Sequence, residues 1–275
     1  MEKNPKLLIL ILFTMLLPNI SSSSEILGEH PLLSDEFTFT LGGFFSDHKG
    51  KYKYNGPLNN GREIDFQNDL GISNDKVLPR GTFKWRMSNS SQLQFEYFSF
   101  SDSGSANFTG RFGEGFFSGA IDSEERLDIY RLFYGYNFFK EADYELGVGI
   151  GTHIARTKAS LEGSATVGGI PLPSFKEELD EWGLLPNLGA YGSYAFSDKV
   201  LLSARADWLS LSVSGIDGTL WNASTTLQYQ MHRNFGLGLA YNYINVEMSE
   251  DENQPGGWDG QLKFTGPSVF VNFNF

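Results

Sequence analysis

Large apolar residues alternate with small or polar ones along most of the chain after residue 36. From Phe235 to Tyr243 the odd positions are bulky and apolar, whereas the even positions between them are glycine, alanine or asparagine. A period of two residues places successive side chains on opposite faces of a β-strand. Helical periodicity is nearly absent after residue 36, so the pattern predicts a chain built from half-buried strands. The same alternation occurs in residues 91–101, 126–139, 144–154 and 218–231.

The residue types on the two faces distinguish two kinds of β-protein. A soluble sandwich would carry Leu, Val and Ile inside and Lys, Glu and Thr outside. Here the polar face carries Gly, Ser, Asn, Gln and isolated charges, and the apolar face ends in aromatic residues. This is typical of a transmembrane barrel with a lipid-facing apolar surface, aromatic girdles and a polar lumen. A secreted soluble β-protein is the alternative. The predicted lipid-facing aromatic residues are Phe95, Tyr97, Tyr130, Tyr134, Tyr136, Trp221, Tyr229, Tyr241 and Tyr243.

The connections between these segments alternate in length, which favours an outer-membrane barrel with short periplasmic turns and long extracellular loops. Short turns are expected near residues 88–92, 139–144, 196–200 and 231–235, and long polar stretches at 47–78, 102–125, 158–183 and 249–259. We predict an antiparallel up-and-down barrel of about ten strands, with eight or twelve as alternatives. Segments 51–56 and 62–67 could form a hairpin in the first loop or raise the count to twelve. The ten strands are 36–46, 79–88, 91–111, 116–139, 143–160, 184–197, 199–214, 218–231, 234–248 and 260–275.

The first residues have the layout of a secretory signal peptide. Two lysines precede the apolar run Leu7–Leu17, which Pro18 ends and four serines follow. Such a run is shorter than the roughly 20 apolar residues that a spanning helix needs. A retained anchor helix is the alternative. We therefore expect a cleaved signal peptide over residues 1–24, a short periplasmic segment over 25–35 and the barrel over 36–275.

Composition removes several functional classes. The chain of 275 residues has no cysteine, so disulfide scaffolds, thiolate zinc sites, cysteine nucleophiles and iron–sulfur clusters are excluded. A net charge of −12 argues against nucleic acid as a partner, because binding it requires a basic face. A hydrophobic content of 40% is too low for a helical membrane bundle. It suits a barrel, in which only every second residue meets lipid.

The last strand carries a resemblance to a known class. Its alternate residues Val269, Val271, Phe273 and Phe275 are apolar, and the chain stops on phenylalanine. This resembles the C-terminal insertion signature of Gram-negative outer-membrane β-barrel proteins, and the layout is similar to that of small barrels of the OmpA and OmpW kind. The resemblance implies location in the outer membrane and contact with its lipid and lipopolysaccharide. It also implies periplasmic chaperones and the barrel-insertion machinery as partners during biogenesis.

Charged residues on the lumen side of the predicted strands nearly cancel. Because charges in a narrow interior need partners to offset desolvation, we expect a network that pairs across the lumen. The alternative is a constriction that selects small solutes, since ten strands leave a filled interior or a thin water path. The predicted lumen charge network is Lys84, Arg86, Glu96, Arg131, Glu145, His153, Arg205 and Asp207.

No residue pattern predicts catalysis or a cofactor. His153 could be a base or a ligand, but a histidine in a polar lumen is more often a hydrogen-bonded filler. His48 lies beside Asp47 near the top of the first predicted strand, and the omptin surface proteases use Asp and His at that rim. The sequence resembles that family only in its predicted strand number, because the closely spaced aspartates and the Asp-x-His on facing strands are missing. A lipid A deacylase would need His close to Ser, and no His-x-Ser occurs. The Gly147–Gly151 run lacks the following helix of a nucleotide-binding loop.

Acidic residues gather in two predicted loops and could hold divalent cations, although their spacing is not that of an EF-hand. A solvated loop surface is the other interpretation, and whether a metal binds is left open. We therefore predict a non-enzymatic barrel that is structural or a narrow passage for small or apolar solutes. The alternative is a surface enzyme, lipid A-modifying or omptin-like, or an adhesin acting through its loops. The acidic residues are Glu177, Glu178, Asp180, Glu181, Glu247, Glu250, Asp251, Glu252 and Asp259.

Overall fold

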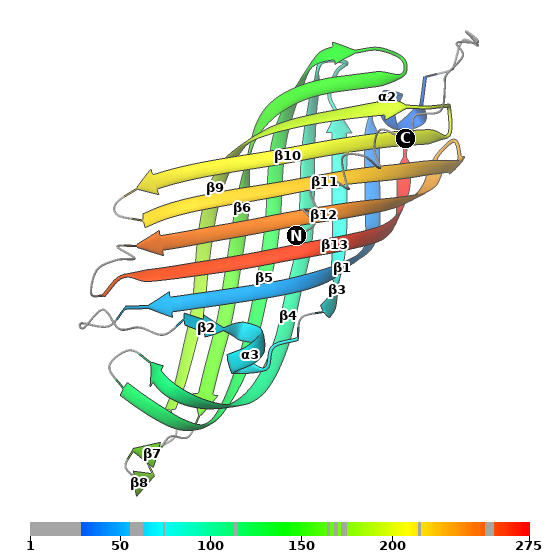
Figure 1. Cartoon of the computed structure of the whole chain (residues 1–275). Coiled ribbons are helices and arrows are strands. Elements are labelled where there is room, and N and C mark those ends of the chain that lie inside the picture. Colours follow the sequence, from blue (N-terminus) through cyan, green and yellow to red (C-terminus); the bar gives the residue numbers. More distant parts are fainter. Residues whose placement is uncertain are drawn as a thin grey trace, which may run out of the picture.

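Ten long strands close into an antiparallel barrel in the described part of the chain (Figure 1). The computed structural model describes residues 29–55, 63–73, 75–112, 115–163, 166–167, 170–171, 175–213, 216–250 and 256–275, so the predicted signal peptide lies outside it. Consecutive barrel strands pair with one another, and the last pairs with the first. The predicted fold class and strand number are confirmed. The strands are β1 (Phe37–Tyr54), β3 (Asp75–Arg86), β4 (Ser91–Phe112), β5 (Gly115–Lys140), β6 (Tyr144–Gly163), β9 (Phe175–Ala195), β10 (Val200–Val213), β11 (Ile216–His232), β12 (Phe235–Glu250) and β13 (Trp258–Asn274).

The remaining described elements are short. Strand β2 (Glu63–Asp65) pairs with β1 alone among the described strands, so the expected hairpin in the first loop is present and does not raise the barrel count to twelve. Helix α3 (Phe66–Leu70) follows β2, and helix α2 (Pro31–Ser34) precedes β1. Strands β7 (Thr166–Val167) and β8 (Ile170–Pro171) form a separate two-stranded sheet. None of the described helices is long and apolar enough to cross a membrane.

The short turns all lie at one end of the barrel, together with both ends of its wall. We call this the turn end and the opposite end the loop end. Between them the outer face carries a band of exposed apolar side chains, as lipid contact requires. The predicted aromatic residues all lie on this outward register. Phe95, Tyr134, Tyr136, Trp221, Tyr229 and Tyr241 are exposed, and Tyr97, Tyr130 and Tyr243 are half-buried.

Toward the loop end the polarity of the two faces inverts, so that apolar side chains face inward and polar ones outward. The sequence predicted a polar lumen and did not predict this inversion. On β4 the outward side changes from Phe95 and Tyr97 to Ser99 and Ser101, while Phe100 points inward and is fully buried. Because this part of the wall meets water, its apolar residues pack inside as in a soluble barrel. The apolar cluster at the loop end comprises Phe44, Ile64, Leu70, Ile72, Leu78, Phe98, Phe100, Leu127, Ile129, Ile244 and Phe264.

The wall also splits at two places toward the loop end. The ladder between β3 and β4 ends at the Arg80–Phe98 pair, and α3 packs against β4 beyond it. The Ser123 hydroxyl of β5 also donates to the Leu70 carbonyl of α3 at 3.2 Å. The ladder between β9 and β10 ends at the Leu188–Trp208 pair, although both strands continue and pair with their other neighbours. In Figure 1 these two strands diverge toward their loop ends.

Candidate functional site

Helix α2 lies in the barrel mouth at the turn end. Its first turn is capped by His30, whose Nδ1 accepts from the Leu32 amide at 3.2 Å, and Pro31 occupies the first helical position, where its missing N–H is not needed. Leu32 and Leu33 are buried against Ala195 and Leu201 of the wall. The described part of the segment predicted as periplasmic therefore closes the turn end from within.

Charged side chains of the wall hold this segment in place. The Lys84 ammonium donates to the Leu32 carbonyl at 2.9 Å, and Lys140 pairs with Glu29 at 2.8 Å. Asp35 accepts hydrogen bonds from Arg233 and, at 2.5 Å, from Asn274. The segment is thus tied to β3, to the end of β5, to the turn before β12 and to the last strand.

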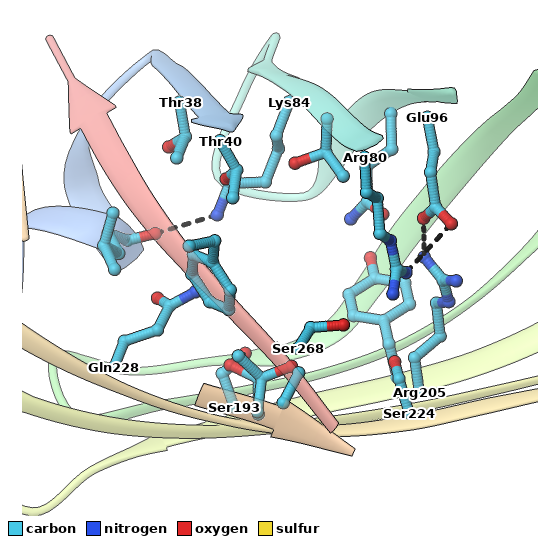
Figure 2. Close-up of a pocket in the computed structure, with 18 of the residues that line it drawn as sticks. Thr38, Thr40, Arg80, Lys84, Glu96, Ser193, Arg205, Ser224, Gln228 and Ser268 are labelled. Atoms are coloured by element: carbon cyan, nitrogen blue, oxygen red, sulfur yellow. Dashed lines mark hydrogen bonds and ion pairs between the residues drawn. The ribbon is translucent and has the colours of Figure 1, made fainter. Parts of the chain in front are cut away.

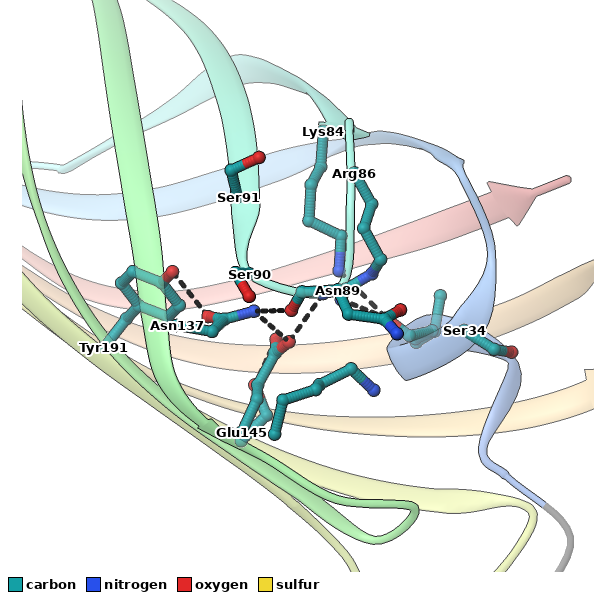
Figure 3. Close-up of polar contacts among 12 residues, drawn as sticks. Ser34, Lys84, Arg86, Asn89, Ser90, Ser91, Asn137, Glu145 and Tyr191 are labelled. Atoms are coloured by element: carbon teal, nitrogen blue, oxygen red, sulfur yellow. Dashed lines mark hydrogen bonds and ion pairs between the residues drawn. The ribbon is translucent and has the colours of Figure 1, made fainter.

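A buried ion pair lies just above the helix. Arg86 donates to Glu145 at 2.8 Å, and both side chains are less than 5% exposed. Asn137 adds a contact to Glu145 at 3.4 Å and accepts from the Tyr191 hydroxyl at 2.6 Å (Figure 3). These contacts join β3, β5, β6 and β9 across the turn end of the lumen.

A second charged layer crosses the middle of the barrel. Arg131 donates twice to Asp207, at 2.8 and 2.9 Å, and Asp207 is completely buried. Arg205 lies between Asp207 and Glu96, at 3.3 and 3.2 Å, and Glu96 also pairs with Arg80 at 2.9 Å (Figure 2). This ionic layer, Arg80, Glu96, Arg131, Arg205 and Asp207, connects β3, β4, β5 and β10 and alternates in sign along its length.

Neutral side chains complete the layer. The Asn222 amide contacts His153 Nε2 at 3.1 Å and Asp207 at 3.4 Å. Asn242 accepts from Arg80 and donates to Ser268 at 2.7 Å. The histidine is therefore hydrogen-bonded within the wall rather than placed beside a nucleophile.

The predicted lumen residues fall into these two layers. Lys84, Arg86 and Glu145 lie at the turn end, and Glu96, Arg131, His153, Arg205 and Asp207 lie in the middle. Sequence reasoning missed Arg80, Asn222 and Asn242. Arg80 lies within the strand predicted at residues 79–88 and has the same parity as Lys84 and Arg86, so following that alternation back by two steps from Lys84 would have included it on the inward face.

An internal cavity of about 180 Å³ lies between the helix and the ionic layer (Figure 2). Its lining is rich in hydroxyl and amide groups and could hold several water molecules. The polar side chains around it include Thr38, Thr40, Thr82, Ser224, Gln228 and Ser268.

Two titratable residues are buried in the apolar part of the loop end. His48 packs against Phe100 and Phe264, with ring centroids 4.2 and 4.6 Å away, and this burial lowers its pKa to about 4. Burial, reinforced by the charge of Asp102, raises the pKa of Glu125 to about 7. Asp47 alternates with His48 and lies on the outward face, so the two do not converge on one site.

The acidic loop residues do not form a metal site within the described part of the chain, where no group of three potential ligands converges. Asp180 pairs with Arg156 at 2.9 Å and Lys158 at 3.2 Å. Glu247 accepts from Gln261, and Glu250 accepts from the Trp258 indole. Asp259 has an interaction partner. Outside the described residues lie Asp251 and Glu252 and the side chains of Glu177, Glu178 and Glu181.

Comparison with known proteins bears on the fold. The outer membrane protease OmpT from Escherichia coli aligns with a TM-score of 0.58 and 13% identity, covering 92% of this chain and all of OmpT. The chain has the fold of an outer-membrane β-barrel. At this identity the likeness concerns the fold alone, and protease activity is a property of OmpT.

Other similarities to this outer-membrane barrel are weaker. The toluene transporter TodX from Pseudomonas putida aligns with a TM-score of 0.35 and 9% identity over 90% of this chain and 93% of its own. Ail from Yersinia pestis aligns at 0.31 and 9%, over 86% and 98%. A family described as a protein of unknown function, DUF481, matches residues 125–255. No curated protein sequence matches the chain.

Proposed function

We propose that this chain is exported to the outer membrane and acts there as a sealed barrel, a structural wall carrying its loop-end surface rather than an open pore. The observation that carries the proposal is the Arg131–Asp207 pair in the middle of the lumen, with side chains that are 1% and 0% exposed. A passing ion would have to separate this pair. Breaking a buried pair leaves an uncompensated charge, which costs about 3–5 kcal/mol.

Further barriers lie in series with this pair. Helix α2 covers the turn end, and the apolar cluster, whose Phe100 and Phe264 pack against His48, lies inside the loop end. An apolar constriction opposes ions because they would lose their hydration there. The cavity between α2 and the ionic layer therefore has a barrier on either side of it along the barrel axis.

The outer face supports the membrane part of the proposal. Its apolar band would meet lipid, and Val269, Phe273 and Phe275 are exposed along the strand that carries the insertion signature. The surrounding partners would be outer-membrane lipid and lipopolysaccharide, after passage through periplasmic chaperones and the insertion machinery. The predicted signal peptide would be removed before the barrel closes.

Planar-bilayer recording tests the sealed lumen. The mature full chain, purified from outer membranes, is expected to give no large, stable current steps. The Arg131→Ala variant, checked for heat-modifiable gel migration, is expected to give more frequent brief openings than the native chain. Large, stable steps from the native chain would overturn the sealed-barrel proposal in favour of a narrow passage.

Fractionation and N-terminal mass analysis test export. We expect the chain in the outer-membrane fraction with its N-terminus between Ser22 and Glu25. A periplasmic soluble pool, or an uncleaved chain in the inner membrane, would contradict the proposed location.

A further inference from the structure

The wall contains one split that no described element fills. Beyond the Leu188–Trp208 pair, β9 continues along β6 to the Phe175–Gly163 pair and β10 continues along β11 to the Val213–Ile216 pair, without pairing to each other. We call this split the β9–β10 seam. Unpaired strand edges are costly in hydrocarbon, so the seam is expected to begin where the wall leaves the lipid. Trp208 and Trp221 are neighbours at this level, as expected for an interfacial girdle.

An apolar groove lies directly below the seam on the lipid-facing side. Its volume is about 460 Å³, within the range of small-molecule sites. It crosses β5, β6, β9 and β10. The apolar side chains along it are Leu132, Tyr134, Ile150, Pro186, Leu188 and Trp208.

The described residues leave the interior behind the seam open. By alternation from Asp207, Leu209 and Leu211 lie on the inward face, yet Leu211 is 40% exposed. A side chain added at Gly183 would meet no described atom within 4 Å. By contrast, the split between β3 and β4 is packed by α3. The open side therefore leads from the groove toward the inside of the loop end.

Unpaired polar groups lie where the groove meets the seam. Asn187 alternates with the outward Leu188, so its side chain faces the inside of the barrel at the first position of β9 that is unpaired with β10. It is 4% exposed, and neither its side-chain oxygen nor its nitrogen has a partner among the described residues. The Thr152 hydroxyl, on the neighbouring strand, is also buried without a described partner. Buried polar groups are normally hydrogen-bonded, so both point to a ligand that carries polar atoms.

We propose that the β9–β10 seam is a lateral binding site for a single-chain amphiphile from the outer leaflet, with its tail along the groove and its hydrogen-bonding head reaching inward through the seam to Asn187. The groove is continuous with the lipid-facing band, so an acyl tail can enter it from the membrane. The Asn187 amide can both donate and accept hydrogen bonds to the head group. This inference rests on the proposed function, because in a barrel with a sealed lumen a ligand would bind at the wall and not pass through the interior.

Photolabelling tests the site. The mature full chain in nanodiscs is exposed to a 16-carbon fatty acid bearing a diazirine, and adducts are mapped by mass spectrometry. We expect adducts concentrated on residues 184–188 and 208–211. Adducts spread evenly around the outer face would overturn the proposal.

Two wall variants of the same chemistry provide a matched comparison. Leu188→Trp fills the groove, whereas Leu239→Trp alters a similarly exposed leucine on β12, away from it; the exposed fractions are 60% and 58%. We expect labelling at the seam to fall about tenfold in the first variant, equivalent to about 1.4 kcal/mol, and to stay unchanged in the second. Equal effects of the two substitutions would contradict the site.

Asn187→Leu tests the head group separately. It should weaken labelling by the acid probe while leaving labelling by a diazirine alkane of equal length unchanged. Equal loss with both probes would refute the role of Asn187. Each variant is first checked for heat-modifiable migration. The labelling pattern is measured independently of ion conduction. A barrel that conducts ions but is labelled at the seam would overturn only the sealed-lumen proposal. A barrel that does not conduct and is not labelled at the seam would overturn only the proposed lateral binding site.

Discussion

Arg131 on β5 and Asp207 on β10 form a two-point hydrogen bond across the barrel, at 2.8 and 2.9 Å, although two strands separate them in the wall. The guanidinium also lies 4.4 Å from the centre of the Phe133 ring. Such a bidentate pair fixes both distance and orientation. It therefore holds β5 and β10 in one register across the lumen.

Removing one partner of this pair should destabilise the barrel strongly. We expect Asp207→Ala to lower the free energy of unfolding by about 3–5 kcal/mol, because the buried guanidinium loses its counter-charge. Urea unfolding in lipid vesicles measures this. The double variant Arg131→Met, Asp207→Leu should recover much of the loss, since apolar residues of similar volume can replace a buried pair.

The exposed Arg156–Asp180 pair is the control for this prediction. Asp180→Ala should have little effect, because an exposed pair gains little over its hydrated charges. A double lumen variant as unstable as Asp207→Ala alone would show that the charges themselves, not their pairing, are required.

Close packing inside the wall depends on glycine at particular positions. A Cβ at Gly149 would lie 2.1 Å from the Tyr134 carbonyl oxygen and 2.5 Å from Phe133, whereas one at Gly183 would meet no described atom within 4 Å. We expect Gly149→Ala to cost about 1–3 kcal/mol through overpacking. Gly183→Ala should stay within about 0.5 kcal/mol of the native chain. Thermal conversion on heat-modifiable gels ranks the two, and equal stability would contradict the packing argument.

The helix at the turn end should contribute through its two leucines. Leu33 is fully buried, so Leu33→Ala is expected to cost about 2–5 kcal/mol and to expose residues 29–35 to protease. Leu41→Ala, on the outward face and 62% exposed, is the control and should leave that segment protected. Protease digestion followed by N-terminal mass analysis measures the difference. An equally sensitive N-terminus in both variants would argue against a seated helix.

Glu125 should make stability depend on pH. Its pKa rises from the ordinary 4.5 to about 7 in the folded chain, so the folded state keeps a proton that the unfolded state loses. Stability is then fully present below about pH 4.5, falls as the pH rises toward about 7 and is constant above it, by about 3 kcal/mol in total. Urea unfolding of Glu125→Gln across this range should lack that component. An unchanged pH profile in the variant would refute the assignment.

The strand pattern was predictable because lipid imposes it. From Phe235 to Tyr243 alternate residues face hydrocarbon and the lumen, so large apolar residues alternate with small or polar ones in the sequence itself. Above the lipid that rule ends, so Phe98 and Phe100, which share the parity of the charged Glu96, could not be placed by polarity. Period-two reasoning gives the face of a residue but not the medium beside it.

The partners within the lumen were not predictable in detail. Lumen parity identified Arg131 and Asp207 as inward, but their pairing depends on how far each strand is shifted along its neighbours around the closed barrel. The same holds for the Lys84 contact to Leu32, because nothing in residues 25–35 indicates that the segment turns back into the mouth. Arg80 is a different case, because the strand predicted at residues 79–88 already contains it and its parity matches that of Lys84 and Arg86, so its inward position was predictable from the sequence.

The contacts of Asp35 have a consequence for the order of assembly. Its partners are Asn274, one residue from the end of the chain, and Arg233, in the turn before β12. In Figure 1 helix α2 and the C-terminus lie close together. The start of the barrel can therefore acquire its polar partners only when the final strand is in place. Protease resistance of the N-terminal segment would then report that insertion is complete, and it would distinguish closed barrels from those arrested before the last strand is added.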